Sequence, residues 1–205
     1  MNKSVIIIGA SGHGKVIADI VLKSGDKVVG FLDDDTTLPK EIAGFPLIGV
    51  VSDFTKYKDC CFIIGIGNGS IRKRIVELLE GQVSFYTAIH PAAVISSVDV
   101  TVGEGSAIMA GAVINAGTVI GEHSIINTSA VVEHDNRIGS FTHVSVGAKL
   151  GGTVTVGDLS WIGIGATVSN NISIADEVMT GAGAVIVKDI SESGTYVGVP
   201  VRKIK

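Results

Sequence analysis

The chain has 205 residues, 46% of them hydrophobic and 18% charged, with a net charge of −4 and only two cysteines, the adjacent Cys60 and Cys61. This composition lies far from the disordered regime, and the negative balance argues against a general nucleic-acid-binding protein, whose surface would be basic. Two neighbouring cysteines favour neither a disulfide framework nor a metal cluster, and the short apolar stretches predict a cytoplasmic protein without membrane insertion.

The first part of the chain alternates apolar strands with helices. Residues 4–8 form a continuous β-branched run, typical of a strand buried on both faces, and residues 28–32 and 62–66 have the same character. Two segments with helical features, KVIADIVLKSG and SIRKRIVELLE, follow the first and third of these runs. This order predicts a parallel α/β, Rossmann-like domain, which we place at residues 1–87.

A glycine loop, GASGHG, joins the first strand to the first helix. Backbone N–H groups and the helix dipole at such a junction suit a phosphate group. The acidic run DDD ends the second strand about 20 residues further on, where a carboxylate can meet a ribose hydroxyl. The spacing is G-x-x-G-x-G rather than G-x-G-x-x-G, which favours a nucleotide diphosphate over NAD. The alternative is that these are only turn glycines, and Asp35 by itself is better explained as a solvated carboxylate.

A six-residue repeat runs from Val102 almost to the end of the chain. Its first position is Val, Ile or Leu in fourteen of fifteen hexads, with Thr180 as the exception, and its fifth is mostly a small residue or valine. Such a period predicts a parallel β-helix, placed at residues 88–205, in which positions one and five point into the core. In this register His134 lies at a corner and His143 points outward.

These hexads follow a GASGHG…FLDD…IGIGN domain, contain EHD…FTHVSVGAK and end in YVGVPVRKI. Over nearly the whole chain this combination resembles the sialic-acid O-acetyltransferase-like family, above all its nucleotide-sugar N-acetyltransferases of the bacillosamine-pathway type. The resemblance implies a left-handed parallel β-helix with three hexads per coil. It also implies a homotrimer that uses acetyl-CoA.

The resemblance also assigns roles to individual residues. It makes His134 the general base and Asp135 the acid that orients it, although close relatives carry Glu at the second position and Glu133 is a competitor for the role. Acetyl-CoA contacts are implied for four further residues: His143, Gly152, Ile164 and Ala182. On the resulting hypothesis, the first domain holds the nucleotide through Ser11, Gly12, His13, Asp33, Asp34 and Gly67.

Nine residues are half a circuit of a three-hexad coil, so His134 and His143 would share a site only across a subunit interface. Asn127 either positions the sugar or is a stacked corner asparagine, and we expect His123 to be solvated. The His and Cys spacing predicts no catalytic metal.

The resulting hypothesis is direct acetyl transfer from acetyl-CoA to the amino group of a nucleotide-linked sugar, with UDP-4-amino-4,6-dideoxy-N-acetylglucosamine as the expected acceptor. One alternative is O-acetylation of a sugar hydroxyl, as in sialic acid. The other is a non-catalytic hexapeptide scaffold or nucleotide sensor.

Overall fold

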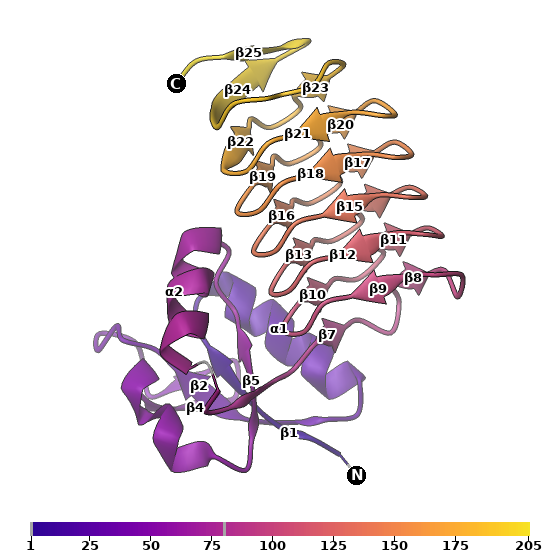
Figure 1. Ribbon diagram of the computed structural model, residues 1–205. Coiled ribbons are helices and arrows are strands. Elements are labelled where there is room, and N and C mark those ends of the chain that lie inside the picture. Colours follow the sequence, from indigo (N-terminus) through magenta and orange to yellow (C-terminus); the bar gives the residue numbers. More distant parts are fainter. Residues whose placement is uncertain (1, 80) are drawn as a thin grey trace.

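A computed structural model describes residues 2–79 and 81–205. Its N-terminal part is an α/β unit and its C-terminal part is a column of stacked coils, with the α/β unit packed beside the first coils (Figure 1). Among the described residues, no helix combines the length and the apolar character needed to cross a membrane.

The N-terminal sheet is centred on β1 (Ser4–Ile8), which pairs in parallel with β2 (Lys27–Leu32) and β5 (Cys61–Ile64). These are the three strands that the sequence predicts. The sheet order is β3-β4-β2-β1-β5-β6, in which only β3 and β4 run antiparallel. The additional strands are β3 (Glu41–Ile42), β4 (Phe45–Gly49) and β6 (Ser84–Phe85).

Helices cover both faces of this sheet. The helix α1 (Gly12–Lys23) packs Ile17, Ile20 and Val21 into one apolar cluster. The other face packs against α2 (Gly69–Leu79) and the 3-10 helix η1 (Val51–Tyr57). Both predicted α-helices are present; Glu80, the last residue of the second predicted segment, lies outside the described residues.

The column is a left-handed parallel β-helix built from three sheets (Figure 1). Ala107 pairs with Ile125, which pairs with His143, so one coil is three hexads as the resemblance implies. The first sheet, called the docking sheet below, contains β7 (Ala88–Ile89), β10 (Ala107–Ile108), β13 (Ile125–Ile126), β16 (His143–Val144), β19 (Trp161–Ile162), β22 (Val178–Thr180), β24 (Gly194–Gly198) and β25 (Val201–Lys203).

The other two sheets complete the triangular section. The second contains β8 (Val94–Ile95), β11 (Val113–Ile114), β14 (Val131–Val132), β17 (Lys149–Leu150), β20 (Thr167–Val168) and β23 (Val185–Ile186). The third contains β9 (Thr101–Val102), β12 (Val119–Ile120), β15 (Arg137–Ile138), β18 (Thr155–Val156) and β21 (Ser173–Ile174).

The interior of the column is filled by positions one and five of the hexads, including Ile126, Ala130 and Val132. The exception at position one, Thr180, is also buried, and its hydroxyl accepts a hydrogen bond from the Gly163 N–H at 2.9 Å. A buried hydroxyl is tolerated there because it is paired.

The fourth hexad position has a left-handed backbone in every corner from Asp99 to Gly183, whether or not it is glycine. Stacking of the coils gives the backbone N–H groups of these corners hydrogen-bond partners. The Asp135 N–H, for example, donates to the Ala116 carbonyl of the preceding coil at 2.9 Å. Residues with side chains, such as His123, Asp135 and Phe141, therefore occupy corner positions whose backbone conformation favours glycine.

The β-helix begins earlier than the hexad pattern suggests. Strands β7 and β8 already pair with β10 and β11, but the step from Ile95 to Val102 holds one residue more than a hexad. The α1 face of the N-terminal domain shares an apolar cluster with outward residues of the docking sheet, including Ala107 and Ile125. This sheet is therefore the surface on which the two domains meet.

Candidate active site

The corner between β14 and β15 carries the predicted base and its predicted partner. Asp135 occupies the left-handed corner position, with φ of 57°, and its Oδ2 lies 2.8 Å from His134 Nδ1. A carboxylate only accepts, so Nδ1 carries the proton of this bond and Nε2 keeps a free lone pair. Both side chains are well exposed, 59% for His134 and 64% for Asp135, so Nε2 can meet a substrate.

Glycines in the neighbouring coils make room for this pair. A Cβ on Gly152 would lie 2.5 Å from His134 Nε2, and a Cβ on Gly117 would overlap the Asp135 carboxylate. The fold thus brings Gly152, predicted to contact acetyl-CoA through its backbone, directly against the predicted base.

Asn136 supports the corner from the inside of the column. Its side chain is fully buried, and Nδ2 donates to the carbonyls of Glu133 at 2.5 Å and Gly151 at 2.9 Å. These bonds join the His134 corner to the coil above it. Because buried carbonyls need partners, Asn136 fixes the backbone from which the imidazole projects.

The structure separates the two acidic neighbours of His134. The Glu133 carboxylate accepts a hydrogen bond from Asn115 Nδ2 at 2.9 Å in the coil below. The carboxylate beside the imidazole is therefore that of Asp135. Which residue orients the base in catalysis remains a prediction, and this geometry favours Asp135.

His143 points out of the column from β16, as its register predicts, but the N-terminal domain covers it and leaves 6% of it exposed. Its Nδ1 lies 3.3 Å from the Gly67 carbonyl oxygen and its Nε2 lies 2.9 Å from Asn127 Nδ2. The ring also packs 4.4 Å from that of Trp161, centroid to centroid. Burial, with a smaller effect of the Arg72 charge, lowers the pKa of His143 to about 3, so the ring is neutral.

His13, at the start of α1, faces His143 across the domain junction with ring centroids 6.3 Å apart. Its Nε2 is buried without a hydrogen-bond partner among the described residues. Burial, followed by the Arg72 charge, lowers the pKa of His13 to about 4. The predicted nucleotide residue His13 and the predicted acetyl-CoA residue His143 therefore lie together within one subunit.

The expectation that His123 is solvated is wrong. Its side chain is 4% exposed, stacks on Phe141 at 5.4 Å and meets the edge of Phe85 at 4.6 Å. Burial, with the Arg72 charge second, lowers the pKa of His123 to about 4. His123 does point outward from a corner, but the N-terminal domain packs onto that corner.

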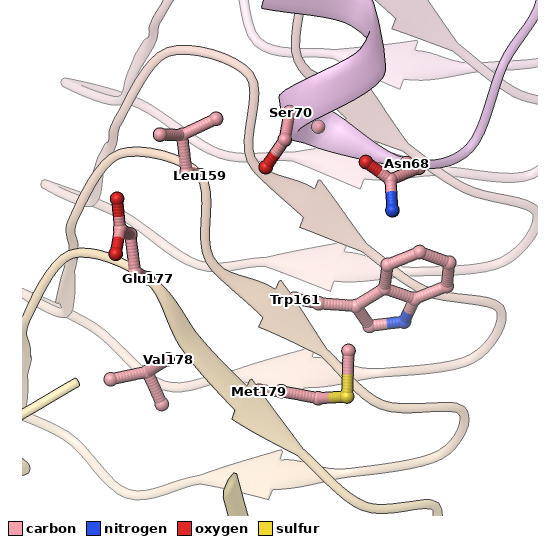
Figure 2. A pocket seen from close by; sticks show the side chains of 8 residues that line it. Asn68, Ser70, Leu159, Trp161, Glu177, Val178 and Met179 are labelled. Atoms are coloured by element: carbon pink, nitrogen blue, oxygen red, sulfur yellow. The ribbon is translucent and has the colours of Figure 1, made fainter. Parts of the chain in front are cut away.

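Two cavities lie at the edges of the N-terminal domain. One of about 250 Å³ lies between the start of α2 and the docking sheet, where Trp161 and Met179 face Asn68 and Ser70 (Figure 2). The other, of about 230 Å³, lies at the carboxyl ends of β1 and β2 and is lined by Ile8, Gly9, Asp33, Asp34, Val51, Ile66, Ile71, Arg74 and Ile75. This is the edge at which ligands bind in parallel α/β sheets.

The predicted acidic residues of the second cavity are tied to its backbone. Asp33 Oδ2 accepts a hydrogen bond from the Ala10 N–H of the glycine loop at 2.7 Å, and Asp34 Oδ1 accepts one from the Val51 N–H at 2.9 Å. Asp33 thus accepts a hydrogen bond from one of the loop N–H groups that are predicted to bind a phosphate. The exposed Ser11 and Gly12 follow it at the start of α1.

Comparisons with known proteins agree with this architecture. The family described as PglD N-terminal domain matches residues 4–79. The acetyltransferase domain of PglB from Neisseria gonorrhoeae FA1090, solved in complex with acetyl coenzyme A, is 36% identical with a TM-score of 0.94, and the match covers 100% of both chains. The chain belongs to the family of bacillosamine-type nucleotide-sugar N-acetyltransferases.

Two other members of the N-acetyltransferase family extend the comparison. A variant of GDP-perosamine N-acetyl transferase from Caulobacter crescentus, in complex with CoA and GDP-perosamine, is 34% identical with a TM-score of 0.94, covering 98% of this chain and 97% of that one. UDP-N-acetylbacillosamine N-acetyltransferase from Bacillus subtilis is 40% identical over 113 residues. That match spans 53% of this chain and only about half, 52%, of the relative.

The remaining predicted residues of this family member are distributed over the column. His134 lies at the corner between the second and third sheets, whereas His143 lies in the docking sheet. Ile164 and Ala182 are exposed at one edge of that sheet in successive coils, where the Gly183 N–H donates to the Ile164 carbonyl at 2.8 Å. Within residues 2–79 and 81–205, no group of three His, Cys, Asp or Glu side chains could hold a metal ion.

Three residues of the site were not predicted: Arg72, Asn136 and Trp161. Asn136 had a detectable signal, because it is a large polar residue at an inward hexad position that is usually small. Trp161 is the single tryptophan and stands at the outward sixth position, as His143 does. Arg72 had no sequence signal, since its burial depends on how the two domains dock.

Proposed function

We propose that this protein transfers the acetyl group of acetyl-CoA to the amino group of a UDP-linked 4-amino-4,6-dideoxy sugar. The PglB domain in complex with acetyl coenzyme A supports the donor, and the names of the Bacillus subtilis and Caulobacter crescentus relatives support a nucleotide-linked amino-sugar acceptor. The nucleobase in this proposal rests on the Bacillus subtilis relative, since the Caulobacter crescentus enzyme was solved with a GDP sugar.

The observation that carries the proposal is the exposed His134 with its Nδ1 held 2.8 Å from Asp135 Oδ2. The amine nitrogen of the sugar attacks the thioester carbonyl and loses one proton to His134 Nε2. The tetrahedral intermediate collapses to the amide, the C–S bond breaks, and the proton passes from His134 to the CoA thiolate. Asp135 stabilises the imidazolium formed between these steps, as an acid does in other His-dependent acyl transfers.

The N-terminal domain supplies the nucleotide site in this proposal. The free N–H groups of Ser11, Gly12 and His13 at the start of α1 receive the diphosphate. The cavity lined by Asp33 and Asp34 receives the nucleoside, with the carboxylates near its hydroxyl groups. The sugar then extends toward the domain junction at Gly67 and His13.

The test measures CoA release with UDP-, dTDP- and GDP-linked 4-amino sugars for the wild type, His134→Gln and the exposed control Lys188→Ala. We expect the UDP sugar to be preferred and His134→Gln to lower kcat by about 100-fold or more, the range for loss of a general base. Nucleotide affinity, measured by calorimetry, should not change in His134→Gln, and Lys188→Ala should match the wild type.

Three results would contradict the proposal, each in its own way. Unchanged turnover in His134→Gln would show that His134 is not the general base. Acetylation of free sialic acid without any nucleotide would indicate a sugar O-acetyltransferase. Nucleotide binding without acetyl-CoA binding would indicate a non-catalytic scaffold or sensor.

A further inference from the structure

Arg72 is a buried arginine without an acidic partner. It lies on α2 with 1% of its surface exposed, and no carboxylate of the described residues lies within ion-pair distance of it. Burial lowers the pKa of Arg72 only to about 10, so the guanidinium is charged at neutral pH. Burying an unpaired charge costs several kcal/mol unless hydrogen bonds compensate, so its partners are informative.

These partners are backbone carbonyl oxygens from both domains. From the loop after β5, Gly67 accepts from Nη1 at 2.8 Å, and Ile66 accepts from the same atom at 3.0 Å. From the β-helix, Phe141 accepts from Nη2 at 2.6 Å and His123 accepts from Nε at 2.9 Å. The planar guanidinium has a fixed fork of donors, so Arg72 determines where the Gly67 loop lies relative to the docking sheet.

The same Gly67 carbonyl lies 3.3 Å from His143 Nδ1. A carbonyl oxygen only accepts, so Nδ1 carries the ring proton and Nε2 is an acceptor. Asn127 must then turn its amide nitrogen, 2.9 Å away, toward Nε2, while its Oδ1 accepts from the Thr128 N–H at 2.8 Å. One N–H of the Asn127 amide is left without a partner among the described residues.

We propose that Arg72 is a positioning residue of the acyl-transfer site: through the Gly67 carbonyl it selects one tautomer of His143 and so directs the free amide N–H of Asn127 toward an oxygen atom of the bound substrates. The role of that N–H rests on the proposed function, whereas the tautomer does not. If Arg72 only held the two domains together, it would not determine which of the His143 ring nitrogens donates and which accepts a hydrogen bond.

The experiment uses two substitutions at Arg72 and a neighbouring control. Arg72→Lys keeps a charge but has no fork, and Arg72→Met keeps apolar bulk without donors. Lys73→Met changes the exposed next residue of α2. Long-range ¹H–¹⁵N NMR of the histidine rings, with His143→Gln to assign the signal, reads the tautomer directly.

We expect a single Nδ1–H tautomer at His143 in the wild type and in Lys73→Met, and a mixture or the Nε2–H form in both Arg72 variants. In the acetyl-transfer assay, Arg72→Lys should lower kcat about tenfold or more, as expected for lost hydrogen bonds to a charged group, while its far-UV circular dichroism stays that of the wild type.

An Nε2–H tautomer in the wild type would overturn the proposal, as would an unchanged Nδ1–H tautomer in a folded Arg72 variant. The wild-type spectrum decides the first point even if Arg72→Met does not fold. If the wild type shows the expected tautomer but transfers no acetyl group, the proposed function fails while the link from Arg72 to His143 stands.

Discussion

Asp135 has two roles at the His134 corner. It occupies a backbone conformation that Asp and Asn tolerate better than most residues, and its carboxylate lies beside Nδ1 of the proposed base. Glu133, equally close in sequence, bonds to Asn115 instead. Both acids adjoin His134 in sequence. The backbone conformation at the corner therefore decides which carboxylate contacts the imidazole.

We therefore predict that Asp135→Asn keeps the fold and loses activity. Asparagine fits the left-handed position, but its side chain cannot stabilise the imidazolium as a carboxylate does. We expect kcat to fall by about tenfold to 100-fold, less than the loss of the general base itself would cause, because His134 is still present. The melting temperature should stay within about 2 °C of the wild type. Steady-state kinetics and thermal unfolding measure the two quantities.

Glu133→Gln is the matched control, because it removes the other carboxylate of the corner. It should retain near wild-type kcat. The assignment of the orienting acid would be reversed if Glu133→Gln lost activity while Asp135→Asn kept it.

At the scale of elements, the N-terminal domain packs onto the corner between β12 and β13 as well as onto the docking sheet. His123 lies there between Phe85 and Phe141, with its Nδ1 buried and unpaired among the described residues. Its pKa is about 4 in the folded protein and about 6.5 in an unfolded chain. Between these values the unfolded state binds more protons, so the free energy of unfolding falls as pH falls from 6.5 to 4.

We predict that His123→Phe reduces this acid sensitivity. Phenylalanine suits the aromatic neighbours, and Phe141 shows that it is tolerated at the same left-handed corner position, with φ of 58°. The wild type should lose free energy of unfolding between pH 7 and pH 5, and this loss should be smaller in the variant by up to about 2 kcal/mol. Urea unfolding at the two pH values measures the difference.

Part of the acid sensitivity should remain, because the lowered pKa values of His13 and His143 act in the same direction. An equal loss in His123→Phe and the wild type would show that His123 does not titrate on unfolding.

The sequence predicts the elements whose signal is local and periodic. Strand β1 and the coils from Val102 onward follow from apolar patterning. By contrast, β3 has only two residues, and β4, although apolar, contains Pro46 and ends at Gly49, residues that are depleted in strands. The regular hexad pattern becomes visible only from Val102, because one extra residue between Ile95 and Val102 breaks the six-residue step in the first coil. The burial of His123 and Arg72 depends on contacts between residues far apart in sequence, which no local pattern contains.

At the scale of the whole molecule, one subunit presents the two halves of the proposed site on different sides. His134 lies at a corner away from the docking sheet, whereas His13 and the nucleotide cavity lie on the domain that covers that sheet. The proposed trimer would bring His134 of one subunit to the N-terminal domain of its neighbour. If that is so, two inactive variants with defects in different halves should complement each other.

We predict such complementation between His134→Ala and Gly12→Asp. A side chain at Gly12 meets no atom within 4 Å, so Gly12→Asp should fold, while its carboxylate at the α1 N-terminus repels a diphosphate. Gly12→Ala is the control for bulk without charge and should retain most activity. In equal mixtures that are unfolded and refolded together, about a quarter of the sites of a cyclic trimer combine two intact halves. CoA release should then recover to about a quarter of the wild-type rate, whereas sites contained within single subunits would give no recovery, because every subunit carries one defect.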